Sequence, residues 1–252
     1  MKKIMLTIVV LFAIVSLNAQ QTYIKYEFMK ELPGQDYEKL EQSWINYHKE
    51  LIKAGAINLH RVWKVLPGSN VDYDYIVTTS YNSYADALGL GKNISTDEFK
   101  TKYPEDYKIM ASTTLSTRTM VRSLILKLDL GLSDPSFQIV PGKSIGNMVF
   151  IKSKNDKYVN AEIKFSKKWH QFFIDNKRKD AFYFSSVVGG GGTDVDISNI
   201  ISHVFKNIDQ YSTPSMNDLK PTTQEQIEID QLVSYRDLKR SIMLLNVMSI
   251  EK

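Results

Sequence analysis

The sequence predicts an α+β protein built from two tandem copies of one β-α-β-β-α-β unit. The first observation is an internal repeat of 122 residues that places Tyr47-His48 over Trp169-His170 without a gap. The second is that the segment from Arg118 to Leu126 recurs as Arg236 to Leu244, 118 residues later, so the second copy carries a small net deletion. A fixed period in a chain of this size indicates duplicated structural units.

Each copy shows the expected elements in the same order. In the first copy the helix from Tyr37 to Ala54 has apolar residues at helical spacing, and Gly55 stands where a C-cap glycine belongs. Alternating apolar residues and turn signals predict the other elements. The first copy has strands at 23–29, 57–66, 73–81 and 121–130 and a second helix within 96–118. The second copy has strands at 147–151, 181–188, 195–201 and 238–248 and helices at 155–176 and 225–234.

These elements divide the mature chain into two ferredoxin-like units. We expect the first unit over residues 20–131 and the second over 145–252. The linker is expected at 132–144, which contains Asp134-Pro135 and Pro141-Gly142 between two strand patterns.

The first residues have the pattern of a signal peptide. Lys2 and Lys3 precede an uncharged, almost wholly apolar run from Ile4 to Leu17, and Ala19 offers a small residue for cleavage. The run has 14 residues, fewer than the roughly 20 that span a bilayer. We therefore expect removal of residues 1–19, export of a soluble chain to the periplasm or medium, and no membrane attachment after cleavage.

Composition narrows the classes of partner. The chain has no cysteine, so it forms no disulfide and carries no lipidated cysteine. The formal charge of +4 falls to +2 without Lys2 and Lys3, and it is spread along the sequence. This is not the basic patch of a nucleic-acid-binding protein, and we expect no nucleic-acid partner. The sequence does not fix the oligomeric state.

The tandem order resembles that of the dimeric α+β-barrel superfamily. The resemblance is carried by the element order, the two aromatic-histidine pairs, and strands ending in Leu124-Ile125-Leu126 and Ile242-Met243-Leu244. It implies that the two sheets pack together as an α+β barrel within one chain. It covers nearly the whole mature chain, but the superfamily includes monooxygenases, haem-binding enzymes and proteins of unknown activity. Shared fold therefore does not choose an activity.

The best site candidates are His48 and His170, each beside an aromatic residue, Tyr47 or Trp169, at one repeat-equivalent helix position. Imidazole can act as a general base or as a haem or metal ligand. The other interpretation is structural, because a buried histidine can simply donate a hydrogen bond from helix to sheet. A ligand pocket, if present, is expected between a first helix and its sheet, with His170 the more accessible histidine.

A second candidate set is the repeated arginine pair Arg122 and Arg240. Both open the last strand of their copy, where they can bind the carboxylate or phosphate of a small molecule. A structural role also explains the duplication without a ligand, with Arg118 and Arg236 expected near the ends of the preceding helices.

Other motifs carry little chemistry. Asp72-x-Asp74 and Asp194-x-Asp196 have too few oxygen ligands for calcium and are expected at solvated hairpin ends. The glycine run at 189–192 lacks a phosphate-loop ending and is expected to be a flexible turn. No nucleophile elbow or His-Glu-x-x-His motif occurs, and we expect no metal site.

Resemblance to the haem-binding branch of the superfamily, such as chlorite dismutase-like proteins, implies His170 as an axial ligand with Arg178 or Arg240 near the haem. The sequence adds no haem signature, and no cofactor is expected from the residues. We thus expect an exported small-molecule-binding or scaffold protein. The alternative is an oxidative or haem-binding enzyme of the barrel superfamily, and the sequence leaves the choice open.

Overall fold

The computed structural model describes residues 21–191, 196–212 and 220–252. The expected signal peptide lies outside these residues, as do Gly192 and Asp194. Every element expected within the described ranges is present, and the strands are mostly longer than the sequence predicts.

The first unit has the predicted β-α-β-β-α-β order. Its strands are β1 (Tyr23–Glu31), β2 (Leu59–Val65), β3 (Tyr75–Tyr81) and β4 (Arg118–Ser133). Its helices are α2 (Tyr37–Ala54), the short α3 (Tyr84–Ala87), α4 (Thr96–Lys102) and α5 (Pro104–Thr117). The bounds of α2 are those predicted, because Asp36 caps its first turn and Gly55 ends it with a φ of 71°. The helical segment expected within 96–118 consists of α4 and α5, and Pro104 lies in the first turn of α5, the position to which the sequence suits it.

The second unit repeats this order. Its strands are β5 (Ile145–Ser153), β6 (Ala181–Gly191), β7 (Asn199–Phe205) and β8 (Arg236–Glu251). Its helices are α6 (Tyr158–Asp175), α7 (Ile208–Ser212) and α8 (Thr223–Ser234). A capping box between Thr222 and Glu225 starts α8.

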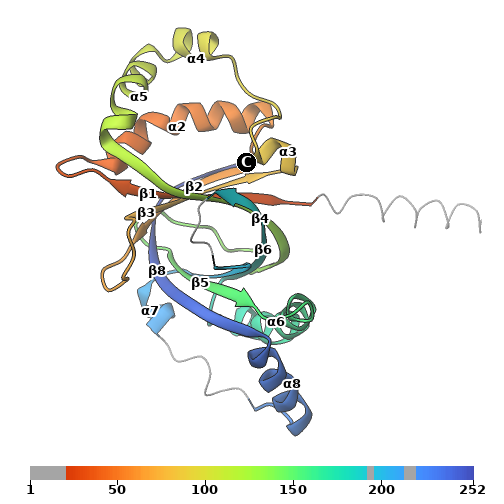
Figure 1. Ribbon diagram of the computed structural model, residues 1–252. Coiled ribbons are helices and arrows are strands. Elements are labelled where there is room, and N and C mark those ends of the chain that lie inside the picture. Colours follow the sequence, from red (N-terminus) through yellow and green to blue (C-terminus); the bar gives the residue numbers. More distant parts are fainter. Residues whose placement is uncertain (1–20, 192–195, 213–219) are drawn as a thin grey trace, which may run out of the picture.

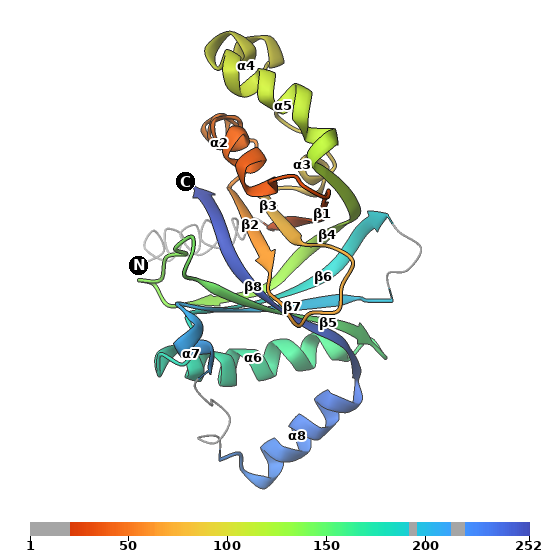
Figure 2. The ribbon, with the colours of Figure 1, turned by 90° about the vertical axis from the view of Figure 1, so that its left-hand side faces the viewer.

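The eight strands form one closed antiparallel barrel in the order β1-β3-β2-β8-β5-β7-β6-β4. Each unit contributes four neighbouring strands, and the two sheets join edge to edge through β2 with β8 and through β4 with β6. Closure leaves no unpaired edge among the strands that the structure describes. Helix α2 lies on one outer side of the barrel and α6 on the opposite side, as Figures 1 and 2 show.

The core has three parts. One cluster fills the barrel and includes Phe28 and Phe150. A second lies between α2 and its strands around Tyr37 and Val62, and a third lies under α6 around Tyr158 and Phe184. Side chains alternate along each strand between the inner and outer layers. The molecule therefore has one inner chamber and two outer helix–sheet layers in which buried side chains meet.

Contacts between side chains confirm the repeat. Asp74 pairs with Lys30 on β1, and Asp196 pairs with Lys152 on β5, which is the same relationship 122 residues later. Asp196 is exposed, as expected for a hairpin end, whereas Asp74 is half-buried and accepts a hydrogen bond from the backbone of Glu31. The repeat is therefore structural as well as sequential.

The structure corrects the expectation for the glycine run at 189–192. Gly189, Gly190 and Gly191 belong to β6 and pair with β4 at the seam of the barrel, rather than forming a flexible turn. Gly190 has a φ of 145°, and a Cβ there would lie 2.6 Å from the carbonyl oxygen of Ser123. Only glycine permits this close approach.

Within the described residues, no helix has the length and apolar character needed to cross a bilayer.

Candidate functional site

A cavity of about 150 Å³ lies inside the barrel at one end. Apolar and aromatic side chains make most of its wall, among them Ile24, Trp63, Leu128, Met148 and Leu244. Small-molecule sites are typically such mostly apolar chambers with a few polar groups. The sequence analysis did not place a site inside the barrel, because which strand residues face inward together depends on closure.

The polar groups of this cavity include Tyr26, Arg61, Thr78, Tyr183 and Ser202. Burial raises the pKa of Tyr26, so its hydroxyl stays protonated and can donate a hydrogen bond. Arg61 donates to Glu251 at 2.7 Å and to Ser249 at 3.3 Å. These contacts hold a guanidinium group in the cavity wall.

The predicted arginines Arg122 and Arg240 lie near the opposite end of the barrel. Arg122 lies over the ring of Phe28 at 5.7 Å, and Arg240 lies over Phe150 at 5.8 Å. Burial raises the pKa of Tyr73, and the positive charges of both arginines act against that shift. The fold therefore brings the two arginines toward one tyrosine, but it separates them from the histidines.

A polar cluster lies in the outer layer between α2 and β2. The ring of His48 stacks on that of His60 with 3.5 Å between centroids and 14° between planes. Nε2 of His60 lies 3.7 Å from Oε2 of Glu41, and Nδ1 of His60 lies 3.1 Å from the Thr79 hydroxyl. Glu41 and His60 are each only 3% exposed. Two imidazoles and a carboxylate thus meet in a nearly dry layer.

Burial lowers the pKa of His48 well below its usual value, and the nearby His60 and Arg118 lower it further. His48 is therefore neutral near pH 7. Nδ1 of His48 and Nε2 of His60 are both buried and have no hydrogen-bond partner. Buried nitrogens of this kind are uncommon, because each loses water without gaining a replacement.

The second unit has a related cluster with different residues. His170 stacks on Phe182 at 4.0 Å, and these two residues are 122 positions after His48 and His60. Phe182 pairs across the sheet with His203. The amino group of Lys179 lies 3.1 Å from Nδ1 of His170 and 3.0 Å from Nδ1 of His203. The four histidines of the chain thus form two pairs, one in each outer layer.

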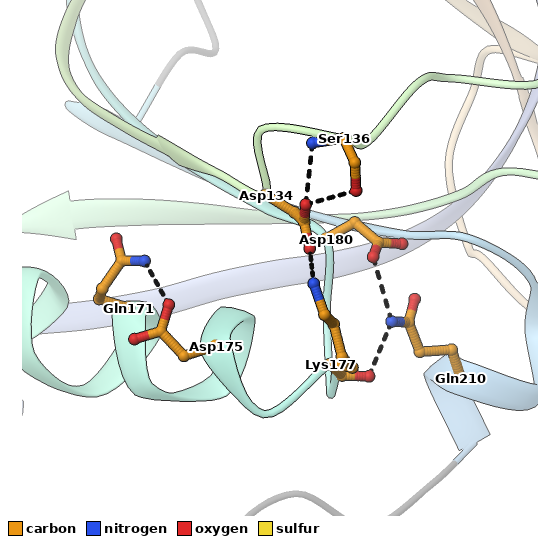
Figure 3. A network of polar contacts seen from close by, with 7 residues as sticks. All are labelled: Asp134, Ser136, Gln171, Asp175, Lys177, Asp180 and Gln210. Carbon is orange, nitrogen blue, oxygen red and sulfur yellow. Dashed lines mark hydrogen bonds and ion pairs between the residues drawn. The ribbon is translucent and has the colours of Figure 1, made fainter.

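Burial lowers the pKa of Lys179 to about 7, and burial also lowers the pKa values of His170 and His203 well below normal. The loop that carries Lys179 is held by polar contacts (Figure 3). Lys177 contacts Asp134, and the Gln210 amide donates to the Lys177 carbonyl at 2.9 Å and to Asp180 at 3.4 Å. These contacts fix the backbone on either side of Lys179.

The structure separates the predicted pocket residues. Tyr47 and His48 lie in the layer of α2, and Trp169 and His170 lie on α6 across the barrel. Tyr47 packs edge-on against Trp44 and His48, and Trp169 lines a surface groove of about 520 Å³ between α6 and α8. The side chains of His170 and His48 are both half-buried, so His170 is not clearly the more accessible of the two.

The surroundings of His170 do not fit a haem. An axial ligand needs a ring nitrogen directed into a flat space large enough for the macrocycle. Here Phe182 covers one face of the imidazole, the rings of Phe165 and His203 approach it at 5.6 and 5.1 Å, and Lys179 contacts Nδ1.

Sequence analysis identified two of the four histidines as candidates and missed Glu41, His60, Lys179 and His203. The spacing from Glu41 to His48 is seven residues, or two helical turns, which puts both on one face. The sequence therefore contained a signal that Glu41 and His48 lie close together. The strand histidines could not be assigned because their partners come from the register of the sheet.

No family model matches the sequence, and no curated protein matches it. Several solved structures, however, have a similar fold. A presumed monooxygenase from Fusobacterium nucleatum subsp. nucleatum is similar with a TM-score of 0.61 and 12% identity, covering 94% of this chain and 96% of that chain. A presumed monooxygenase from Lactobacillus acidophilus has a TM-score of 0.56 and 9% identity, covering 92% and 96%.

A haem-binding protein from Thermus thermophilus has a TM-score of 0.50 and 9% identity, covering 90% of this chain and 91% of that chain. At these identities the likeness concerns the fold alone. The chain has the dimeric α+β-barrel fold, with both ferredoxin-like units in one polypeptide. The fold expected from the sequence, two ferredoxin-like units closed into one α+β barrel, is thereby confirmed.

Proposed function

We propose that this chain is an exported α+β-barrel protein that binds a small molecule in the cavity inside its barrel. The expected ligand is a single aromatic ring with one carboxylate or hydroxyl group. The observation that carries the proposal is the barrel cavity itself, with Trp63 and Tyr183 in its wall and Arg61 beside them.

The size of the cavity supports a ligand of this class. An apolar protein cavity of about 150 Å³ holds a molecule the size of benzene. Aromatic walls favour an aromatic ligand through edge and face contacts. The guanidinium of Arg61 and the hydroxyls of Tyr26 and Ser202 supply hydrogen bonds to one polar group.

The alternative is an oxidative enzyme acting on the same kind of molecule. Its support is that two structures of this fold are described as presumed monooxygenases. Both functions use the cavity, so turnover separates them: an enzyme consumes oxygen when the ligand is added, whereas a binding protein returns the ligand unchanged.

Ligand binding is tested by native mass spectrometry of the mature protein and by calorimetric titration with benzoate, phenol and indole. Leu59→Trp should block binding, because the half-buried Leu59 lines the cavity and a larger ring fills it. Val65→Trp is the matched control, since Val65 lies on the same strand and packs in the barrel core but does not line the cavity. Equal binding by wild type and Leu59→Trp would refute the cavity as the site.

Export rests on the pattern of residues 1–19. Mass spectrometry of protein recovered from the native host should find a mature chain that begins near Gln20. A mature chain that retains Lys2 to Leu17 would refute this part of the proposal.

A further inference from the structure

We propose that Glu41, His48 and His60 form a binding site for one divalent transition-metal ion, with Zn²⁺ or Co²⁺ as the test ions. The site lies in the outer layer under α2 and is separate from the barrel cavity. It goes beyond the sequence analysis, which expected no metal site.

The three residues supply a suitable set of donors. One ligand atom from each lies within 4.8 Å of the other two. Zinc binds imidazole nitrogen and carboxylate oxygen at about 2.0–2.2 Å, which puts tetrahedral donors roughly 3.5 Å apart. The side chains therefore need to close by about 1 Å around the ion, and one of the two stacked rings must turn so that both in-plane lone pairs point at it. Three protein ligands leave a fourth position open, as in zinc sites that hold a water molecule.

The buried nitrogens of this cluster are placed to bind a cation. The Thr79 hydroxyl lies within hydrogen-bond distance of Nδ1 of His60, and Nε2 of His60 faces Glu41. The 3.7 Å between Nε2 and Oε2 of Glu41 is too long for a hydrogen bond. A metal ion between these two atoms would bind both of them. It also gives a partner to Nε2 of His60 and to Nδ1 of His48, which are buried and unpaired.

In the second copy a lysine side chain lies between the two histidines. Lys179 stands 122 residues after Ile57, and its amino group lies between two imidazole nitrogens at 3.0 and 3.1 Å. In the first copy the apolar side chain of Ile57 cannot play this part. The first pair of histidines thus has no such partner, while the second pair is occupied by the amino group of Lys179.

The carboxylates of the two copies differ in the same way. In the second unit Arg236 donates to Glu162 at 2.7 Å and neutralises it. In the first unit the corresponding Arg118 donates to the sulfur of Met29 and lies over the ring of Tyr37. Arg118 therefore does not pair with Glu41, whose carboxylate faces Nε2 of His60 at 3.7 Å and can bind a cation.

The cluster has a route to solvent. Glu41 lines a groove of about 460 Å³ between α2 and the end of β8, together with Glu38, Gln42 and Lys49. Helix α2 supplies both this groove and the buried ligands. A hydrated ion can therefore approach along the groove and exchange its water for the buried donors.

The test uses the mature full-length protein, treated with a chelator and then titrated with Zn²⁺ by calorimetry and with Co²⁺ by visible absorption. We expect one ion per chain, an absorption band of tetrahedral or five-coordinate Co²⁺, and a rise in melting temperature on adding Zn²⁺. Glu41→Gln and His48→Gln should each weaken binding by at least about 100-fold. His170→Gln, the equivalent change in the second copy, should leave binding unchanged.

Two ligand variants are used so that metal binding can still be tested if one of them folds poorly. Circular dichroism checks each fold, and His48→Gln is the mildest change because His48 is half-buried. Absence of stoichiometric binding to the wild type would overturn the proposal. So would equal affinity in wild type, Glu41→Gln and His48→Gln, or an equal loss in His170→Gln.

Discussion

The amino group of Lys179 lies 3.0 Å from Nδ1 of His203 and is almost completely buried. Burial lowers the pKa of this lysine to about 7, from an ordinary value of 10.5. In the unfolded chain the lysine regains its ordinary pKa. Between pH 7 and pH 10 the unfolded chain therefore binds more protons than the folded one, and the stability of the fold rises with pH.

The first prediction is that wild-type protein gains about 2 kcal/mol of unfolding free energy between pH 7 and pH 9 from this group. Lys179→Met should remove the gain, because methionine fills similar space without a charge. Denaturant unfolding at both pH values measures the difference. A wild type and a variant with the same pH dependence would show that the lysine titrates normally in the folded protein.

The second prediction compares two arginines in equivalent places. Arg236→Met should lower the free energy of unfolding by about 3–5 kcal/mol, because it leaves Glu162, which is 1% exposed, as a buried carboxylate without its counter-ion. Arg118→Met should cost less than half as much, because Arg118 contacts a methionine sulfur and a tyrosine ring. Chemical denaturation at pH 7 gives both values. Equal losses would mean that the ion pair of the second copy adds nothing beyond packing.

The third prediction concerns the seam between the two units. Gly190→Ala should destabilise the protein by more than about 3 kcal/mol, because the φ of 145° is strained for alanine and the new Cβ would lie 2.6 Å from the Ser123 carbonyl oxygen. Gly131→Ala in the neighbouring strand β4 is the control, since its Cβ would make ordinary contacts at 3.5 Å or more. Thermal unfolding followed by circular dichroism compares them. Similar melting temperatures for the two variants would show that the seam yields easily.

Local sequence determined the elements and their order. The bounds of α2 follow from the spacing of its apolar residues and from its two caps. The match of His48 with His170 at a spacing of 122 residues indicates two copies of one unit. These signals act over a few residues, or compare like with like, so no knowledge of the tertiary structure is needed to interpret them.

The tertiary structure alone decided how the strand edges pair and which polar side chains meet. Closure through β4 with β6 gives the glycines at 189–191 their role and creates the barrel cavity. Sheet register places Thr79 beside His60 in one copy and His203 beside Phe182 in the other. A shift of one residue in a strand would send each of these side chains to the other face. The sequence by itself therefore determined two similar units, and only long-range pairing decided that one buries two histidines with a lysine and the other with a glutamate.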